Sequence, residues 1–284
     1  MTRRARADAV TAILARTYPD AHCELDFTNP LELLVATILS AQCTDKRVNL
    51  VTPALFRICR TAADYVALPA EQLEELIQST GFFRAKAKNI RACCAALVER
   101  HGGEVPRTMD ELYALAGVGR KTANVVLGNA FDINVGVVVD THVQRLSTLL
   151  GLTTQTTPEK IEQDLIELIP RVQWTLFSHW LIWHGRRRCM ARNPDCPACE
   201  LRTLCPSANR AMKLGEAHTQ PKMSAGPKLL GMKTPSFPNQ DGDKKPSIPR
   251  EDPLARDRRG KASREEVRKV AKVRSPRESR KGGT

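Results

Sequence analysis

The stretch LAGVGRKTANVVLG, residues 115–128, predicts two helices joined by a very short turn. Gly117 and Gly119 flank Val118, and glycines allow a tight turn whose backbone N–H groups are exposed. The run that follows is typical of a helix start, so Lys121 is expected in the first turn of that helix. Helix N-termini carry partial positive charge and disfavour a lysine, so this position needs a chemical reason.

Exposed amides at a helix N-terminus form a ready site for a phosphate group. A helix over 108–116 followed at once by a helix over 120–131 resembles the helix-hairpin-helix motif, which binds the DNA backbone without reading its sequence. A simpler interpretation is that the two glycines only end one helix and turn the chain. If the motif binds DNA, the contacting residues are Gly117, Val118, Gly119, Arg120 and Thr122.

Two roles are open for Lys121. It is either one more phosphate contact or, if desolvation between packed helices disfavours its ammonium form, an amine nucleophile. Asp140 follows the apolar run VGVVV (135–139) and precedes a helical segment, so it is predicted to cap that helix. A capping carboxylate that faces an amine can stabilise positive charge and take part in proton transfer. Lysine and aspartate together suit attack at a deoxyribose C1′ atom, followed by loss of the base.

Other periodic segments up to residue 206 are also helical, so the predicted fold class is all-α. Asn29 and Pro30 mark the start of an apolar helix over 29–42. The pairs Thr108/Glu111 and Thr156/Glu159 predict capping boxes. The strand-like run 135–140 is too isolated to build a sheet and is predicted to be a buried extended connector. Further helices are expected near 5–17, 45–58, 70–79, 84–100, 120–131, 140–150 and 173–184.

The charge of the 284-residue chain is concentrated at its C-terminal end. Residues 207–284 hold 20 Lys and Arg against 9 Asp and Glu, so +11 of the formal net charge of +13 belongs to them. They also hold eight prolines and one aromatic residue, which predicts a disordered basic tail that attracts a polyanion. The sequence shows neither a transmembrane run nor a signal peptide, so we expect an intracellular, soluble protein with no membrane partner.

Four of the nine cysteines form a compact group with the spacing C-x6-C-x2-C-x5-C. Four thiolates in so short a segment can bind zinc or one iron–sulfur cluster, and clustered cysteines in an intracellular chain favour metal over disulfides. The absence of histidine within the loop suits a cubane cluster, but the spacing leaves zinc open. The predicted ligands are Cys189, Cys196, Cys199 and Cys205, and the other five cysteines are expected to be small buried or half-buried residues.

The hairpin, Asp140 and the four-cysteine loop follow one another in that order, and with them the chain resembles the endonuclease III family of DNA glycosylases and abasic-site lyases. The resemblance runs from about residue 5 to residue 206. It rests on the segments LSAQCTDKRVN (39–49), LAGVGRKTANVVL (115–127), VDTHVQRL (139–146) and HWLIWHGRRRCMARNPDCPACELRTLC (179–205).

The resemblance implies a fold of two helical parts on either side of a DNA-binding cleft. A helical barrel would comprise residues 25–134, and a cluster domain would comprise 1–24 and 135–206. Kinked duplex DNA that contains a damaged base or abasic site would lie over the cleft, with the damaged nucleotide flipped into it. The family resemblance further implies a monomeric, cytoplasmic, nucleoid-associated enzyme of base excision repair that removes oxidised pyrimidines.

The resemblance also assigns roles to single residues. Lys121 would form a Schiff base with the sugar, assisted by Asp140, and the four cysteines would hold a [4Fe–4S] cluster. Gln42 would fill the gap that the extruded base leaves, although the segment alone predicts a solvent-facing glutamine. Phe82, directly after a glycine, would be a wedge residue or, equally, part of the core. The basic residues Arg186, Arg187 and Arg188 would contact phosphates.

Three other functions compete with this interpretation. An adenine-mismatch glycosylase shares the hairpin and the cluster, but it would lack a lysine at position 121 and would carry a folded, apolar C-terminal domain. A non-catalytic iron–sulfur DNA-binding module would have no need of Lys121 together with Asp140. A zinc-bound nucleic-acid adaptor would yield a colourless protein.

Overall fold

The computed structural model describes residues 1–208, and the tail from residue 209 onward lies outside the described residues. Within 1–208 every regular element is a helix, which confirms the all-α prediction. No helix of this part is both long and apolar enough to cross a bilayer. The α-helices are α1 (Arg3–Thr17), α2 (Pro30–Leu39), α3 (Asp45–Ile58), α4 (Ala62–Ala67), α5 (Ala70–Ile77), α6 (Phe83–His101), α7 (Met109–Tyr113), α8 (Arg120–Ala130), α9 (Thr141–Leu149), α10 (Pro158–Leu168) and α11 (Trp174–Arg187). Two 3-10 turns, η1 (Gln78–Thr80) and η2 (Arg171–Gln173), precede α6 and α11.

Most helix starts were predictable because their caps are local. The Asn29 side chain accepts a hydrogen bond from the Glu32 N–H at 3.0 Å, and Pro30 occupies the first helical position of α2. The Thr108 hydroxyl accepts one from the Glu111 N–H at 3.4 Å at the start of α7, but the Glu111 carboxylate accepts from the Thr108 hydroxyl and not from its N–H, so the predicted capping box is incomplete. Helix α2 ends at Leu39, three residues earlier than expected.

One predicted cap was wrong, and one short helix was not predicted. The N-cap of α10 is Thr157 and not Thr156, and it makes no side-chain capping bond. Pro158 fixes this start, because a proline needs no N–H partner at the first helical position. The short helix α4 was missed, although Thr61 and Asp64 form a reciprocal capping box of the kind that marks such starts.

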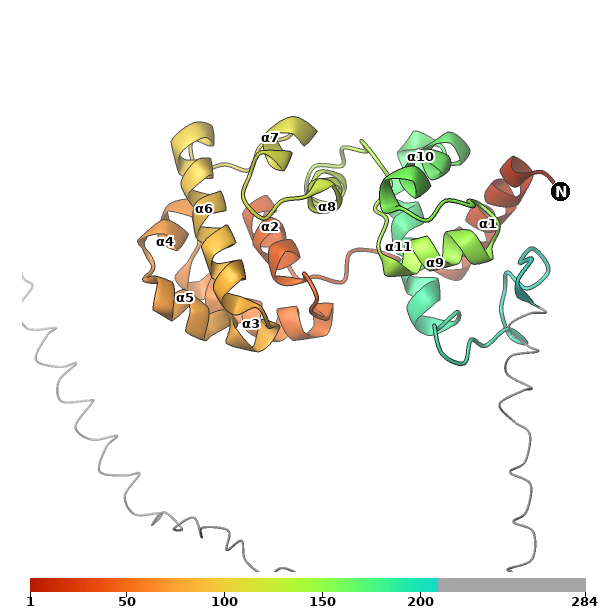
Figure 1. The fold of residues 1–284 in the computed structure, drawn as a ribbon, viewed down its shortest axis with the longest axis horizontal. Helices are drawn as coiled ribbons and strands as arrows, with labels where there is room; N and C mark the ends of the chain where they lie inside the picture. The colour runs from red at the N-terminus through yellow and green to blue at the C-terminus, as the bar shows by residue number, and fades with distance from the viewer. Residues whose placement is uncertain (209–284) are drawn as a thin grey trace, which may run out of the picture. The chain divides into compact units, whose positions relative to one another are not determined.

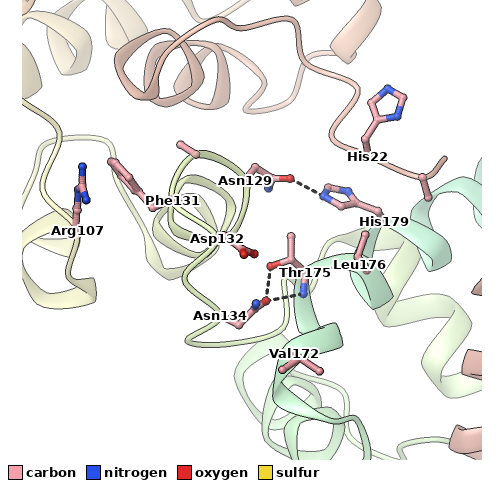
Figure 2. Close-up of a pocket in the computed structure, with 13 residues that line it drawn as sticks. His22, Arg107, Asn129, Phe131, Asp132, Asn134, Val172, Thr175, Leu176 and His179 are labelled. Carbon is pink, nitrogen blue, oxygen red and sulfur yellow. Dashed lines mark hydrogen bonds between the residues drawn. The ribbon is translucent and has the colours of Figure 1, made fainter. Parts of the chain in front are cut away.

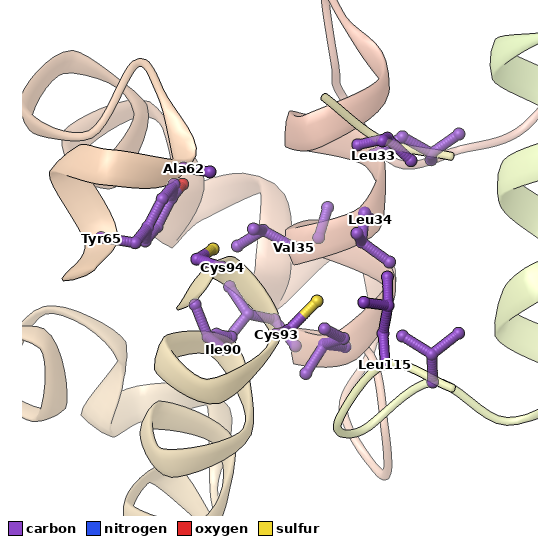
Figure 3. Packing of buried hydrophobic residues seen from close by; sticks show 14 of the residues in the cluster. Leu33, Leu34, Val35, Ala62, Tyr65, Ile90, Cys93, Cys94 and Leu115 are labelled. Atoms are coloured by element: carbon purple, nitrogen blue, oxygen red, sulfur yellow. The ribbon is translucent and has the colours of Figure 1, made fainter. Parts of the chain in front are cut away.

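A first hydrophobic core is built by the helices from α2 to α8. Figure 3 shows part of it, with Val35 of α2 pointing toward the α6 residues Ile90 and Cys94 and Leu34 lying on the side of Leu115. The buried cysteines Cys59, Cys93 and Cys94 belong to this core, as expected for small apolar residues.

A second hydrophobic core is built by α1, α9, α10 and α11, together with Leu201 of the cysteine loop. The chain enters the first core near Leu25 and returns to the second at Val137. We propose that the two cores correspond to the two predicted domains, one over 25–134 and the other over 1–24 and 135–206.

Residues 135–140 form the predicted extended connector between α8 and α9. Val137, Val138 and Val139 are buried, and the Val138 N–H donates to the Ser178 hydroxyl at 3.0 Å. This bond ties the connector to α11, and the connector ends on Asp140. The position of Asp140 is therefore set by packing on both of its sides.

Helix α8 is the element that contacts both cores. It packs on α2 and α7 from the first core and also contacts α11 from the second. In Figure 1 it lies between the group α2–α7 and the group α1, α9, α10 and α11. The residues at its start therefore lie beside the junction of the two cores.

Candidate active site

A cavity of about 1110 Å³ lies between the two cores and is lined by residues of both. Lys121 and Asp140 both line it, the first from the start of α8 and the second from the start of α9. Gln42 reaches the same cavity from the loop between α2 and α3. The fold thus brings together three predicted site residues that are far apart in the sequence.

The hairpin before α8 has the geometry that its glycines predict. Gly117 has φ +75°, and a side chain there would also press on Asn89, whose Cβ would be 2.9 Å away. Gly119 is the N-cap of α8 and supplies no side chain to the first-turn N–H groups. A Cβ at Gly119 would meet nothing within 4 Å, so an anion has open space beside these amides.

Lys121 is exposed on the cavity side of α8, so the desolvation between packed helices on which the nucleophile alternative was based is absent from the free protein. The reason is that the apolar face of α8, which includes Ala123, Val126 and Leu127, takes the packing contacts instead. Lys121 is therefore accessible to a molecule that enters the cavity.

Asp140 is half-buried and caps α9, as predicted. Its Oδ1 accepts a hydrogen bond from the Val143 N–H at 2.8 Å, which fixes the orientation of the carboxylate. A fixed carboxylate that lines the same cavity as an amine can stabilise positive charge that develops there.

Two neutral histidines on the cavity wall were missed by sequence reasoning. Burial lowers the pKa of His179 to about 4, with help from the charge of His22. Burial also lowers the pKa of His142, whose Nδ1 is buried without a hydrogen-bond partner among the described residues. Both lie in segments that carry the family resemblance, His142 in VDTHVQRL and His179 at the start of the segment 179–205, so both could have been suspected.

A second cavity of about 600 Å³ lies between α8 and α11, and Figure 2 shows its lining. His179 borders both cavities, and its Nε2 donates a hydrogen bond to Asn129 Oδ1 at 2.7 Å, because an amide oxygen can only accept. Asn134 accepts hydrogen bonds from Thr175 on the same wall. Neither Lys121 nor Asp140 lines this cavity, so the lysine–aspartate chemistry belongs to the first one.

Gln42 and Phe82 share an unusual backbone conformation. Their φ angles are +53° and +48°, in the left-handed region that costs energy for residues other than glycine. Both side chains are exposed, and Phe82 retains 66% of its surface. The alternative that Phe82 belongs to the core is therefore wrong.

Two of the predicted hairpin contacts need correction. Val118 is buried in the first core, and its N–H donates to the Leu115 carbonyl at 3.2 Å, so neither its side chain nor its amide is free for DNA. The Arg120 guanidinium binds the buried carboxylate of Glu162 on α10. Gly117, Gly119 and half-buried Thr122 keep positions at the hairpin surface.

The three arginines of α11 and its end also have carboxylate partners. Arg186 binds Glu24 and, at 2.7 Å, Asp45 of α3, which links the two cores. Arg187 also binds Glu24, and its guanidinium lies 3.6 Å from the ring centroid of Trp183. Arg188 pairs with Asp195 and Glu200. They are thus not the free phosphate contacts that the resemblance implied, because each is already paired with an acidic residue.

The four predicted cysteine ligands surround one small cavity, whose other walls include Leu146, Leu150 and Leu201. Among the described residues no three side chains converge closely enough to hold a single metal ion. Four thiols around a common space with mainly apolar neighbours form a donor set that fits an iron–sulfur cluster. Arg145 Nη1 lies 3.7 Å from Cys189 Sγ, so one guanidinium can offset part of the charge of the thiolates.

The known proteins to which this chain is similar belong to one family. Residues 35–171 match the HhH-GPD superfamily of base excision DNA repair proteins. The chain is 56% identical over 207 residues to endonuclease III of Synechocystis sp., which covers 73% of this chain and 94% of that protein. It is 45% identical to endonuclease III of Bacillus subtilis, with 70% of this chain and 90% of that protein covered.

Solved structures agree with this. A non-covalent endonuclease III–DNA complex has a TM-score of 0.71 at 45% identity and covers 75% of this chain and 99% of that one. A trapped endonuclease III–DNA covalent intermediate has a TM-score of 0.69 at 46% identity, with 72% and 98% covered. A thermostable thymine-DNA glycosylase, at 18% identity and a TM-score of 0.67, shares the fold.

Proposed function

Since the chain belongs to the endonuclease III family of the HhH-GPD superfamily, we propose that it is a bifunctional DNA glycosylase and abasic-site lyase of base excision repair. It removes oxidised pyrimidines from duplex DNA. The observation that carries this proposal is that Lys121 and Asp140 line one cavity between the two cores, each held at a helix start. A relative of the same family has been trapped as a covalent intermediate with DNA.

Lys121 supplies the nucleophile. Its neutral amine attacks C1′ of the damaged nucleotide, the bond from C1′ to the base breaks, and the base leaves with the bonding electrons. Opening of the sugar ring then gives an imine between Lys121 and C1′. Lys121 is exposed in the free protein, so we expect DNA that covers the cavity to exclude water from around it.

The imine makes strand cleavage possible. It acidifies the hydrogen on C2′, and removal of that proton expels the 3′ phosphate by β-elimination. Water then hydrolyses the imine and releases Lys121. Base removal and strand scission therefore share one covalent intermediate.

Asp140 assists the reaction through the negative charge of its carboxylate. Its carboxylate is held in place by the capping bond to Val143 and can stabilise the positive charge that develops at the sugar as the base leaves. It can also accept and return protons during these steps.

DNA is positioned by contacts around the cavity. The uncapped first-turn N–H groups of α8, which follow Gly119, bind a backbone phosphate, and Thr122 lies close enough in sequence to help. Gln42 and Phe82 project from the surface, which suits them to fill and wedge open the base stack. We expect the enzyme to act as a monomer on chromosomal DNA in the bacterial cytoplasm.

Cys189, Cys196, Cys199 and Cys205 would hold a [4Fe–4S] cluster, because their four thiols face one common space. When bound, such a cluster would cross-link the loop after α11 and support the fold, since metal binding of this kind is coupled to folding. The steps at Lys121 do not involve it.

The test is borohydride trapping on a duplex that carries one abasic site. Reduction of the imine should link wild-type protein covalently to DNA. Lys121→Gln should abolish both trapping and strand scission, while affinity for the duplex falls only modestly. Lys46→Gln is the matched control, because Lys46 is another exposed lysine on the same cavity wall.

The outcomes are distinct. Trapping by Lys121→Gln but not by Lys46→Gln would identify Lys46 as the nucleophile and return Lys121 to the role of a phosphate contact. Wild-type protein that binds the duplex but neither traps nor cleaves it would favour the non-catalytic DNA-binding module.

A further inference from the structure

Lys86 is a buried cation at the start of α6. Its exposed fraction is 5%, yet it forms no ion pair within residues 1–208. Instead its Nζ donates to two backbone carbonyls, Leu39 O and Thr80 O, each at 2.8 Å. Burying an ammonium group without a carboxylate partner is unfavourable, so the presence of a lysine at this buried position requires an explanation.

The two carbonyls have equivalent positions. Leu39 is the last residue of α2, and Thr80 is the last residue of the 3-10 turn η1. Helix ends leave carbonyls without intrahelical partners, and their partial negative charge favours a cation. One ammonium group therefore closes two helix ends that lie about forty positions apart in the sequence.

Each of these helix ends leads directly into an exposed residue of left-handed conformation. Gln42 follows Leu39 by three positions, and Phe82 follows Thr80 by two. Their φ angles of +53° and +48° are the conformations that persist only when surrounding structure enforces them. Lys86 is the side chain whose hydrogen bonds reach the base of both loops.

A purely space-filling role does not account for this arrangement. A methionine would fill the same volume without the cost of burying a charge. Burial lowers the pKa of Lys86, which shows that the site opposes the charged form, and the neighbouring Cys43 thiol acts in the opposite direction. Unlike methionine, the ammonium group carries three N–H donors on one atom, which is enough to bind both carbonyls.

We propose that Lys86 is a positioning residue that fixes the Gln42 and Phe82 loops relative to each other, so that both side chains enter the DNA stack as one rigid unit. This inference rests on the proposed function, which assigns DNA contacts to Gln42 and Phe82. Without Lys86 each loop would move independently and would have to be ordered when DNA binds, which costs free energy.

The first test measures the loops without any substrate. Each loop contains a hydrogen-bonded amide that can report on it, Cys43 N–H to Ser40 O at 3.0 Å and Gly81 N–H to Gln78 O at 3.3 Å. Lys86→Met should speed hydrogen exchange at both amides by about tenfold or more, because both loops lose the same anchor. Lys88→Met removes an exposed lysine from the same helix and should change neither.

The second test separates base extrusion from chemistry. Single-turnover base release is measured on a duplex with one thymine glycol, and on the same strand annealed to a complement that lacks a base opposite the lesion. Lys86→Met should slow release from the paired lesion by about tenfold to a hundredfold, since misplacement of positioning groups has effects of this size. Release from the unpaired lesion should change less than about threefold, because no stack must be opened there.

A mutant cycle shows whether Lys86 acts through the two loops. In a protein that already carries Gln42→Ala and Phe82→Ala, Lys86→Met should hardly change the rate of base release from the paired lesion. If Lys86 acted independently of the two loops, it would slow release by the same factor as in the wild-type protein. If Lys86→Met does not fold, Lys86→Leu, which also has no donor, replaces it in both tests.

Three results would overturn the inference while wild-type activity stands. These are unchanged exchange at Cys43 and Gly81, exchange that rises in one loop only, or equal slowing on the paired and unpaired lesions. Failure of wild-type protein to release thymine glycol would instead count against the proposed function, and the exchange test would still decide what Lys86 does to the loops.

Discussion

Arg120 binds both carboxylate oxygens of Glu162, with Nε 2.7 Å from Oε2 and Nη2 3.1 Å from Oε1. Arg120 is the first residue of α8, and Glu162 comes from α10 in the other core. Asn124, one turn further along α8, donates to the same carboxylate at 3.1 Å. The residue before Lys121 is therefore held by a bidentate bond across the junction of the two cores.

This pair predicts unequal effects of mutating its two members. Arg120→Met leaves the carboxylate of Glu162 buried without its cation, which should lower the free energy of unfolding by about 3 kcal/mol. Glu162→Gln leaves a guanidinium that is 49% exposed and can be hydrated, so about 1 kcal/mol should be lost. Denaturant unfolding of both variants measures the difference. Equal losses would show that the Glu162 carboxylate is solvated when Arg120 is absent.

Arg120 also shows which kind of contact cannot be predicted from the sequence. The hairpin, the caps of α2, α7 and α9 and the extended connector depend on residues within a few positions of one another, and all could be predicted. The partner of Arg120 lies 42 positions away, so the arginine looked like a phosphate contact. The exposure of Lys121 and the burial of His179 likewise depend on which helix faces meet. Packing between distant helices is the information that the local pattern lacks.

The cysteine loop makes a prediction about cofactor content. Anaerobically purified protein should be yellow-brown and should contain iron and acid-labile sulfide in near-equal amounts. Cys199→Ser should lose the colour and much of the soluble yield, because the cluster and the fold of the loop are coupled. Cys43→Ser, a half-buried cysteine outside the loop, should keep both. Stoichiometric zinc without sulfide would identify the zinc-bound alternative.

His179 predicts a loss of stability in acid. Its pKa is lowered from 6.5 to about 4 by burial, so below pH 6.5 the unfolded chain takes up a proton that the folded chain refuses. Its contribution is present above pH 6.5 and should decline by about 3 kcal/mol as the pH falls toward 4. His22 disfavours and Asp140 favours its charged form. The slope of unfolding free energy against pH should be shallower for His179→Gln and unchanged for His101→Gln, which lies outside the cavity.

The basic tail lies outside the described residues, but its charge allows a prediction. The structure shows Ala208 buried beside the cysteine loop, so a truncation should begin at residue 209 rather than at 207. Removal of 209–284 takes away the +11 charge and should flatten the dependence of DNA affinity on salt, since each phosphate contact contributes to that slope. The order of preference among defined lesions should not change. A changed order would assign the tail a part in recognition.

Asp140 permits its two roles to be separated by two substitutions. Asp140→Asn keeps an oxygen that can accept from the Val143 N–H, so the cap of α9 and the stability should persist, but the charge is lost. Base release should then fall by about a hundredfold or more, as when one positioned acid–base or electrostatic group is removed. Asp140→Ala removes the cap as well and should cost a further ~1 kcal/mol of stability. Single-turnover base release and thermal unfolding of both variants distinguish the two roles. If Asp140→Asn releases base at the wild-type rate while Asp140→Ala does not, the carboxylate only caps α9. Another group must then stabilise the charge that develops at the sugar when Lys121 attacks.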